Sequence, residues 1–247
     1  MARTIGEVGE QYLIEQNWNV YSAEDHEVWE ILYERRMKTL QDTGSRMFLD
    51  GARTIGLDPD QVPVLQEVND VLQTLTGWNA APVNGFLPAR EFFLSLAGRR
   101  FPTTVIVRSK EQLNYLPEPD IFHDVFGHVP LHAEPVFTDF LQRFGKVASR
   151  VKTEDETAQM ARLFWFTIKF GLTREDGEIK VYGSGLISSS SDAANALGPN
   201  CDRRPFSLDV VIEQPFEIDR LQDILFVVES FDQLFAAADE MERRLAS

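Results

Sequence analysis

The sequence predicts a mainly α-helical fold with small β elements at its periphery, and three observations support this. Apolar residues recur at helical spacing in several long segments, whereas the β-branched runs are short. Hydrophobic residues make up 43% of the 247 residues and charged residues 26%, as in ordinary globular proteins with a buried core. No repeat, low-complexity tract or long linker divides the chain. We therefore expect residues 1–20, which lack strong periodicity, to form an N-terminal arm and residues 21–247 to form a single domain.

The first half of the chain is predicted to hold three helices and one strand. Ser22 and Asp25 resemble a capping box and predict the start of a helix. A second, amphipathic helix is expected over residues 65–75, and a short one around residues 92–96. The run TTVIVR (103–108) is rich in β-branched residues and predicts a strand.

The second half is predicted to be mainly helical as well. The run PEPDIFHDVFGHVP is expected to form a helix that begins at Pro119 and is ended by Gly127 and Pro130. The remaining expected elements are helices at about 135–149, 156–171 and 231–241, and strands at 178–182, 208–213 and 224–228.

Charge and composition exclude several classes of protein. The net charge of −15 argues against a nucleic-acid-binding protein, which needs a basic face. No apolar run approaches the length of a membrane span, and residues 1–13 lack the basic-then-apolar pattern of a signal peptide. The single cysteine, Cys201, excludes an internal disulfide framework and a cysteine-based zinc cage. We expect a cytoplasmic protein, a monomer or weak homo-oligomer, without nucleic-acid or membrane partners.

Three of the four histidines, His123, His128 and His132, fall within ten residues and mark the place to look for chemistry. His123 and His128 are five residues apart, which is about 140° of rotation on an α-helix, so they converge only if the helix ends between them. Two imidazoles with one carboxylate would form the facial triad of non-haem iron oxygenases. From spacing alone, two ordinary histidines with backbone partners remain the alternative. His132 lies beyond Pro130 and is predicted to be a surface residue.

Three sequence blocks, in this order, resemble the pterin-dependent aromatic amino acid hydroxylases, and in particular the catalytic domain of their bacterial members. The blocks are PEPDIFHDVFGHVP, LFWFTIKFGL and IKVYGSGLISS, and the likeness extends from about Tyr21 through the last helix. The resemblance implies the hydroxylase catalytic-domain fold. It also implies a non-haem Fe(II) monooxygenase that uses a tetrahydropterin and O₂ to hydroxylate an aromatic L-amino acid, with phenylalanine as the first expectation.

The resemblance also implies roles for residues at the matching motif positions. His123 and His128 would be the imidazole ligands of the metal. Arg108 would pair with the carboxylate of the amino acid, and Asp120 would support that arginine. The amino-acid pocket would further include Trp165, Gly185 and Ser188. The pterin would contact Gly85, Leu87, Phe92 and Asp124, with the Phe92 ring stacked on it.

Two positions depart from the family pattern. The third metal ligand of the family is a glutamate, and Lys169 stands in its place, between flanking residues that match without a gap. Phe164 similarly replaces a tyrosine of the family. An ammonium group would repel Fe²⁺ and removes an oxygen ligand.

Three accounts of Lys169 remain open. In the first, His123 and His128 still bind a metal while Lys169 is neutral or turned aside, and the oxidative chemistry is altered. In the second, the metal is lost and the domain is an amino-acid-binding relative. In the third, Lys169 is itself the catalytic group, as a base or as an amine. Glu134 and Asp192 are named as carboxylates that could substitute for the missing ligand.

Overall fold

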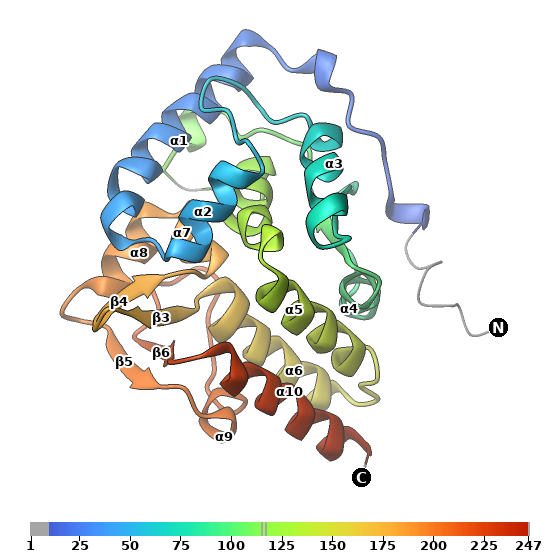
Figure 1. The fold of residues 1–247 in the computed structure, drawn as a ribbon, viewed down its shortest axis with the longest axis vertical. Helices are drawn as coiled ribbons and strands as arrows, with labels where there is room; N and C mark the ends of the chain where they lie inside the picture. The colour runs from blue at the N-terminus through green and yellow to red at the C-terminus, as the bar shows by residue number, and fades with distance from the viewer. Residues whose placement is uncertain (1–9, 115, 117, 247) are drawn as a thin grey trace.

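The structure, a computed structural model, describes residues 10–114, 116 and 118–246 (Figure 1). Its α-helices are α1 (Ala23–Thr43), α2 (Arg46–Thr54), α3 (Leu65–Leu75), α4 (Ala89–Ala97), α5 (Pro135–Ala148), α6 (Glu154–Phe164), α7 (Ser184–Ser188), α8 (Ser190–Leu197), α9 (Leu208–Val211) and α10 (Phe231–Ala246). Its strands are β1 (Asn79–Pro82), β2 (Arg100–Thr103), β3 (Leu172–Glu175), β4 (Glu178–Val181), β5 (Asp202–Pro205) and β6 (Ile224–Val228). Two π-helices, Phe122–His128 and Trp165–Lys169, interrupt this pattern, and short 3-10 turns lie at Glu10–Tyr12, Trp18–Val20, Lys110–Gln112 and Val129–Ala133.

Among the described residues, the strands form two small sheets, in line with the small β elements that were predicted. Strands β1 and β2 pair in parallel, and the other sheet has the order β4-β3-β6-β5. The hairpin between β3 and β4 turns at Asp176 and Gly177, both of which adopt positive φ. Figure 1 shows the four-stranded sheet at one side of the molecule, with α5, α6 and α10 stacked beside it. The mainly helical fold class is confirmed.

Helix α1 begins where the sequence predicts and supports the centre of the molecule. The Ser22 hydroxyl accepts a hydrogen bond from Asp25 N, and the Asp25 carboxylate accepts one from Ser22 N, which completes the capping box. Further along α1, the buried guanidinium of Arg36 donates to the carbonyls of Ile187 (2.6 Å) and Leu186 (2.9 Å). These bonds satisfy the C-terminal carbonyls of α7 and fix that short helix against α1.

The core is rich in aromatic side chains that enclose the π-helix Phe122–His128. The rings of Phe122 and Phe126 stack at 4.6 Å, and Trp29 of α1 meets Phe122 edge-on at 5.3 Å. Helices α4 and α5 pack closely because α5 has a glycine at the crossing: a Cβ on Gly145 would lie 2.4 Å from Ala97 N. Within the described ranges, no helix is long and apolar enough to cross a membrane.

Two predicted strands are wrong. Strand β2 ends at Thr103, and residues 104–109 form no regular element. Their backbone groups bond instead to the segment around the π-helix, since Ile121 N donates to Ile106 O at 2.9 Å and the Asp124 carboxylate accepts from Thr104 N at 2.8 Å. Residues 208–211 form helix α9, because a short apolar run does not distinguish a strand from a helix by periodicity.

Candidate functional site

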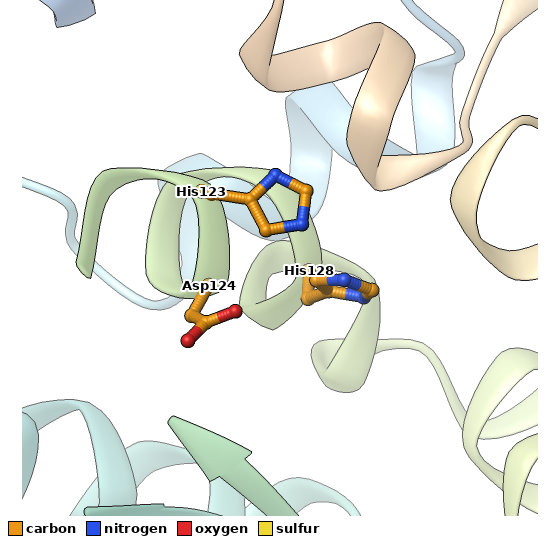
Figure 2. A group of neighbouring side chains, drawn as sticks. All are labelled: His123, Asp124 and His128. Carbon is orange, nitrogen blue, oxygen red and sulfur yellow. The ribbon is translucent and has the colours of Figure 1, made fainter. Parts of the chain in front are cut away.

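The two histidines converge by a route that the sequence did not indicate. We predicted that the helix ends between them, and this is wrong, since the π-helix runs from Phe122 to His128 and a 3-10 turn continues to Ala133. Hydrogen bonds from residue i to i+5 place residues five apart next to each other on one face. The rings of His123 and His128 accordingly lie 5.3 Å apart and nearly perpendicular, on one side of the helix (Figure 2).

These rings form a group of possible metal ligands with a neighbouring carboxylate. One ligand atom from each of His123, Asp124 and His128 lies within 4.8 Å of the other two. The two imidazoles therefore face one cavity, as expected, and their role as ligands of one metal stays a prediction. Among the described residues, the carboxylate with this spacing is Asp124, and neither Glu134 nor Asp192, the substitutes named from the sequence, belongs to the group.

A serine on α7 sets the tautomer of His123. Ser188 Oγ donates its hydrogen to Ser184 O at 2.8 Å and lies 2.8 Å from His123 Nδ1. A hydroxyl has one hydrogen, so at the histidine Ser188 is the acceptor and Nδ1 carries the proton. The lone pair of His123 Nε2 is then free for a metal. Helix α7 can approach this closely because Gly127 lacks a side chain: a Cβ there would lie 2.9 Å from Ser184 O.

Both imidazoles are neutral at neutral pH. Burial lowers the pKa of His123 well below its ordinary value, and the charges of Lys169 and Arg108 lower it further. Burial likewise lowers the pKa of His128, with smaller contributions from His123 and Lys169. A neutral imidazole is the form that binds a metal, so the site holds its histidines ready to coordinate without the loss of a proton.

Lys169 lies in the same cavity and not on the surface. It ends the second π-helix, whose i to i+5 bond from Phe170 N to Trp165 O is 2.8 Å long. Its Nζ is 5.1 Å from the centre of the Trp165 ring. Burial lowers the pKa of the Lys169 amine, while the carboxylates of Asp124 and Asp192 act in the opposite direction.

The cavity has a volume of about 290 Å³ and brings the metal and pterin candidates together. Its lining includes His123, His128, Lys169 and all four residues that the resemblance assigns to the pterin, namely Gly85, Leu87, Phe92 and Asp124. The ring of Phe92 is half-buried and meets Phe164 edge-on at 5.3 Å. Phe164 also lines the cavity, and its ring offers no hydroxyl group to the wall.

Thr104 is a lining residue that sequence reasoning missed. Its backbone N and its Oγ1 donate to the Asp124 carboxylate at 2.8 and 2.7 Å. The signal available in the sequence was its place in TTVIVR, which we interpreted as a strand. Burial raises the pKa of Asp124 to about 7, although the two bonds from Thr104 act against that increase.

The arginine and aspartate assigned to the amino acid form the expected pair. Arg108 donates to Asp120 through Nε (2.7 Å) and Nη2 (2.8 Å), and the Asp120 side chain is fully buried. Asp120 also accepts a hydrogen bond from His123 N at 3.0 Å, which couples the pair to the start of the π-helix. Neither residue lines the 290 Å³ cavity, whereas their neighbours Ile106 and Pro119 do.

Trp165 and Gly185 lie next to Lys169 but outside the lining of the cavity. The Trp165 ring stacks on Phe216 at 4.2 Å and on Phe170 at 4.6 Å. Its Nε1 is buried with no hydrogen-bond partner among the residues that the structure describes. A Cβ on Gly185 would lie 3.0 Å from Lys169 O, so this glycine allows α7 to pack against the second π-helix.

The prediction that His132 lies on the surface is wrong. The 3-10 turn after the π-helix carries it into the core, where its ring lies 5.1 Å from Trp78, 5.0 Å from Phe101 and 6.0 Å from Phe137. Neither ring nitrogen has a hydrogen-bond partner within the described part of the chain. Burial lowers the pKa of His132 to about 3.

Comparison with known proteins identifies the family. The sequence model described as biopterin-dependent aromatic amino acid hydroxylase matches residues 6–246. The chain belongs to this family. The phenylalanine-4-hydroxylase of Chromobacterium violaceum is 40% identical over 229 residues, which are 92% of this chain and 76% of the relative. That of Mesorhizobium japonicum is 40% identical over 224 residues, 89% of this chain and 81% of the relative.

Solved structures of hydroxylases from this family share the fold. The phenylalanine hydroxylase of Chromobacterium violaceum with bound oxidised Fe(III) gives a TM-score of 0.90 at 38% identity, covering 96% of this chain and 88% of that chain. A structure of the same hydroxylase with iron(III) and 7,8-dihydrobiopterin gives a TM-score of 0.90 at 39% identity, covering 95% of this chain and 86% of that chain. The hydroxylase fold expected from the three sequence blocks is therefore confirmed.

Proposed function

We propose that this protein is a tetrahydropterin-dependent monooxygenase-like enzyme that acts on an aromatic L-amino acid, phenylalanine first, through an atypical metal site. One observation carries the proposal: two neutral imidazoles with ligand spacing line the same cavity as the four residues assigned to the pterin. Fe(II) at His123 and His128 would supply the electron-transfer chemistry that activates O₂. The donor set fits such an ion, because two imidazole nitrogens and a carboxylate oxygen lie close together.

The remaining candidate residues are proposed in the roles that the family resemblance implies. Arg108, aligned by Asp120, offers a planar fork for the α-carboxylate of the amino acid. Trp165, Gly185 and Ser188 shape the amino-acid side of the site, and Ser188 also holds the His123 ring. Phe92 offers an aromatic face to the pterin ring, beside Gly85, Leu87 and Asp124.

A second candidate function is favoured by Lys169. A protonated amine next to two imidazoles opposes a dication, so a relative that binds an aromatic amino acid without oxidising it is the main alternative. A lowered pKa makes the neutral form of the Lys169 amine more accessible, which would suit an enzyme that uses this amine as a base. A cytoplasmic location, the division into residues 1–20 and 21–247, and a monomeric or weakly oligomeric state stay predictions.

An oxygen electrode separates the two classes. The full chain is mixed anaerobically with Fe(II), a tetrahydropterin and phenylalanine, and O₂ is then admitted. We expect O₂ uptake that depends on phenylalanine, and a product heavier than phenylalanine by one oxygen atom in mass spectrometry. Samples without phenylalanine, and with a non-aromatic amino acid in its place, measure uncoupled pterin oxidation. Calorimetric binding of phenylalanine with no coupled uptake would establish the binding relative instead.

A further inference from the structure

Asp124 lies where a third metal ligand is needed. It follows His123 directly on the π-helix Phe122–His128, and its carboxylate belongs to the group of ligand atoms within 4.8 Å of one another. Figure 2 shows the carboxylate on the same side of the helix as the two rings, with one oxygen turned toward His128. Ligands at about 2.1 Å from one ion lie about 3 Å apart when adjacent, so the three side chains must close in by up to about 2 Å. Metal binding would close that distance by rotation of these side chains.

The hydrogen bonds of Asp124 leave one oxygen available. Both bonds from Thr104, through its N and its Oγ1, go to Asp124 Oδ2. Among the described residues, no hydrogen bond reaches Oδ1. The Asp124 and His128 side chains are also among the buried polar groups, at 7% and 3% exposure, and no hydrogen bond to the His128 ring is found in the described ranges. Both residues line the cavity, so their unpaired polar atoms are accessible to an ion there.

We propose that Asp124 is the third protein ligand of a His123–Asp124–His128 metal site in this chain. The proposal rests on the proposed function only in that a metal binds at the two histidines. It gives Asp124 a role beyond the pterin contact that the family resemblance implies. The composition is two imidazoles and one carboxylate, which suits Fe(II) and leaves positions open. Thr104 orients the carboxylate through the oxygen that does not bind the metal.

Lys169 cannot take this role while it is protonated, because an ammonium group has three donors and no lone pair. Its charge interacts with two carboxylates, Asp124 and Asp192. When Asp124 turns to a metal, Asp192 remains as the counter-charge of Lys169. Asp192 is therefore the matched control for Asp124: both are carboxylates that act on the Lys169 charge, and Asp192 lies outside the ligand group.

The test titrates the full-length protein with Co(II) alone, followed by visible absorption and by calorimetry. We expect Asp124→Asn to weaken Co(II) binding by more than about 100-fold and to change the absorption band, since even supporting contacts of a metal ligand are worth 10–100-fold. Asp192→Asn should keep the band and weaken binding by less than about tenfold. Asp124→Glu retains a carboxylate and should recover most of the affinity, which separates loss of the ligand from loss of the fold. Far-UV circular dichroism checks that each variant is folded.

The outcomes distinguish this proposal from the proposed function. If the wild type binds Co(II) and Asp124→Asn binds it with the same affinity and band, Asp124 is not a ligand, and the metal-dependent function stands. If the wild type binds neither Co(II) nor Fe(II) but still binds phenylalanine, both the ligand assignment and the metal-dependent function are overturned. Equal losses in Asp124→Asn and Asp192→Asn, with an unchanged band in both, would assign the effect to the charge balance around Lys169 and also overturn the ligand role.

Discussion

The two π-helices that contribute to the cavity share a backbone geometry and differ in the charge that they carry. Phe122–His128 presents two neutral imidazoles and a carboxylate, whereas Trp165–Lys169 presents an amine. Both are held by features independent of these groups, such as the Asp120 bond to His123 N and the close packing of Gly185 on Lys169 O. The comparison teaches that the shape of the site and its charge are separable. Each wall is thus held in place independently of the charged groups that it presents.

The first prediction concerns Arg108, whose charged side chain lies next to the π-helix Phe122–His128. Arg108→Ala should weaken phenylalanine binding by about 1.5–3 kcal/mol, the range for a lost charge-assisted hydrogen bond. The measurement is isothermal titration of the protein with phenylalanine. Arg35→Ala, an exposed arginine of α1, is the control and should bind normally.

Because Asp120 is fully buried, the alanine variant also leaves a carboxylate without its main partner. Arg108→Lys keeps the charge and loses the two-pronged geometry, so it should bind phenylalanine with an affinity between those of the wild type and Arg108→Ala. Unchanged affinity in both variants would refute a role for Arg108 in substrate binding.

The second prediction removes the hydrogen-bond partner that orients the His123 ring. Ser188→Ala removes the acceptor for His123 Nδ1–H and should weaken Co(II) binding about 10–100-fold, the usual cost of losing the partner of a ligating histidine. Calorimetry with Co(II) measures the change. Ser191→Ala, on an exposed serine nearby, is the control. Equal affinities for Ser188→Ala and the wild type would show that the bond does not orient the ring.

The third prediction concerns the histidine just beyond the same π-helix. The pKa of His132 is about 3 in the folded protein, against an ordinary 6.5, so the folded state binds fewer protons than the unfolded chain. His132 thus costs stability as pH falls from 6.5 toward 3, at up to about 1.4 kcal/mol per pH unit. His132→Phe removes this loss, so the variant should gain stability over the wild type as pH falls from 7.5 to 5.5. Urea unfolding at both pH values measures the difference in the free energy of unfolding between the two proteins. His123 and His128 are present in both proteins, so their contributions to the pH dependence of stability cancel in the comparison. A gap independent of pH would contradict the argument.

Much of the fold could be predicted from the sequence because the signals were local. The capping box at Ser22 and the helical period of residues 65–75 and 135–148 mark elements that the structure contains. Residues 103–108 misled us because their backbone partners, near Asp120 and Asp124, lie outside any strand. Such partners are set by tertiary structure and leave no periodic trace.

The site was located by its sequence blocks, but its geometry was not. Residues five apart diverge on an α-helix, and only the buried π-helix brings His123 and His128 together. The same geometry gives Asp124 its place among the ligand atoms, which a sequence analysis based on α-helical spacing did not anticipate. The burial of His132 likewise depends on a 3-10 turn that contains Pro130.

The most direct test replaces Lys169, at the end of the π-helix Trp165–Lys169, with a residue of opposite charge. Fe(II) is titrated anaerobically into the wild type and Lys169→Glu, at a series of pH values. Burial lowers the pKa of the Lys169 amine, so its charge is lost as pH rises, and wild-type affinity should increase with pH. Lys169→Glu should bind Fe(II) at least about tenfold more tightly at neutral pH, a difference of about 1.4 kcal/mol, with a weaker pH dependence. Equal affinities and equal pH profiles in the two proteins would show that Lys169 does not lie at the metal site, and would contradict the account.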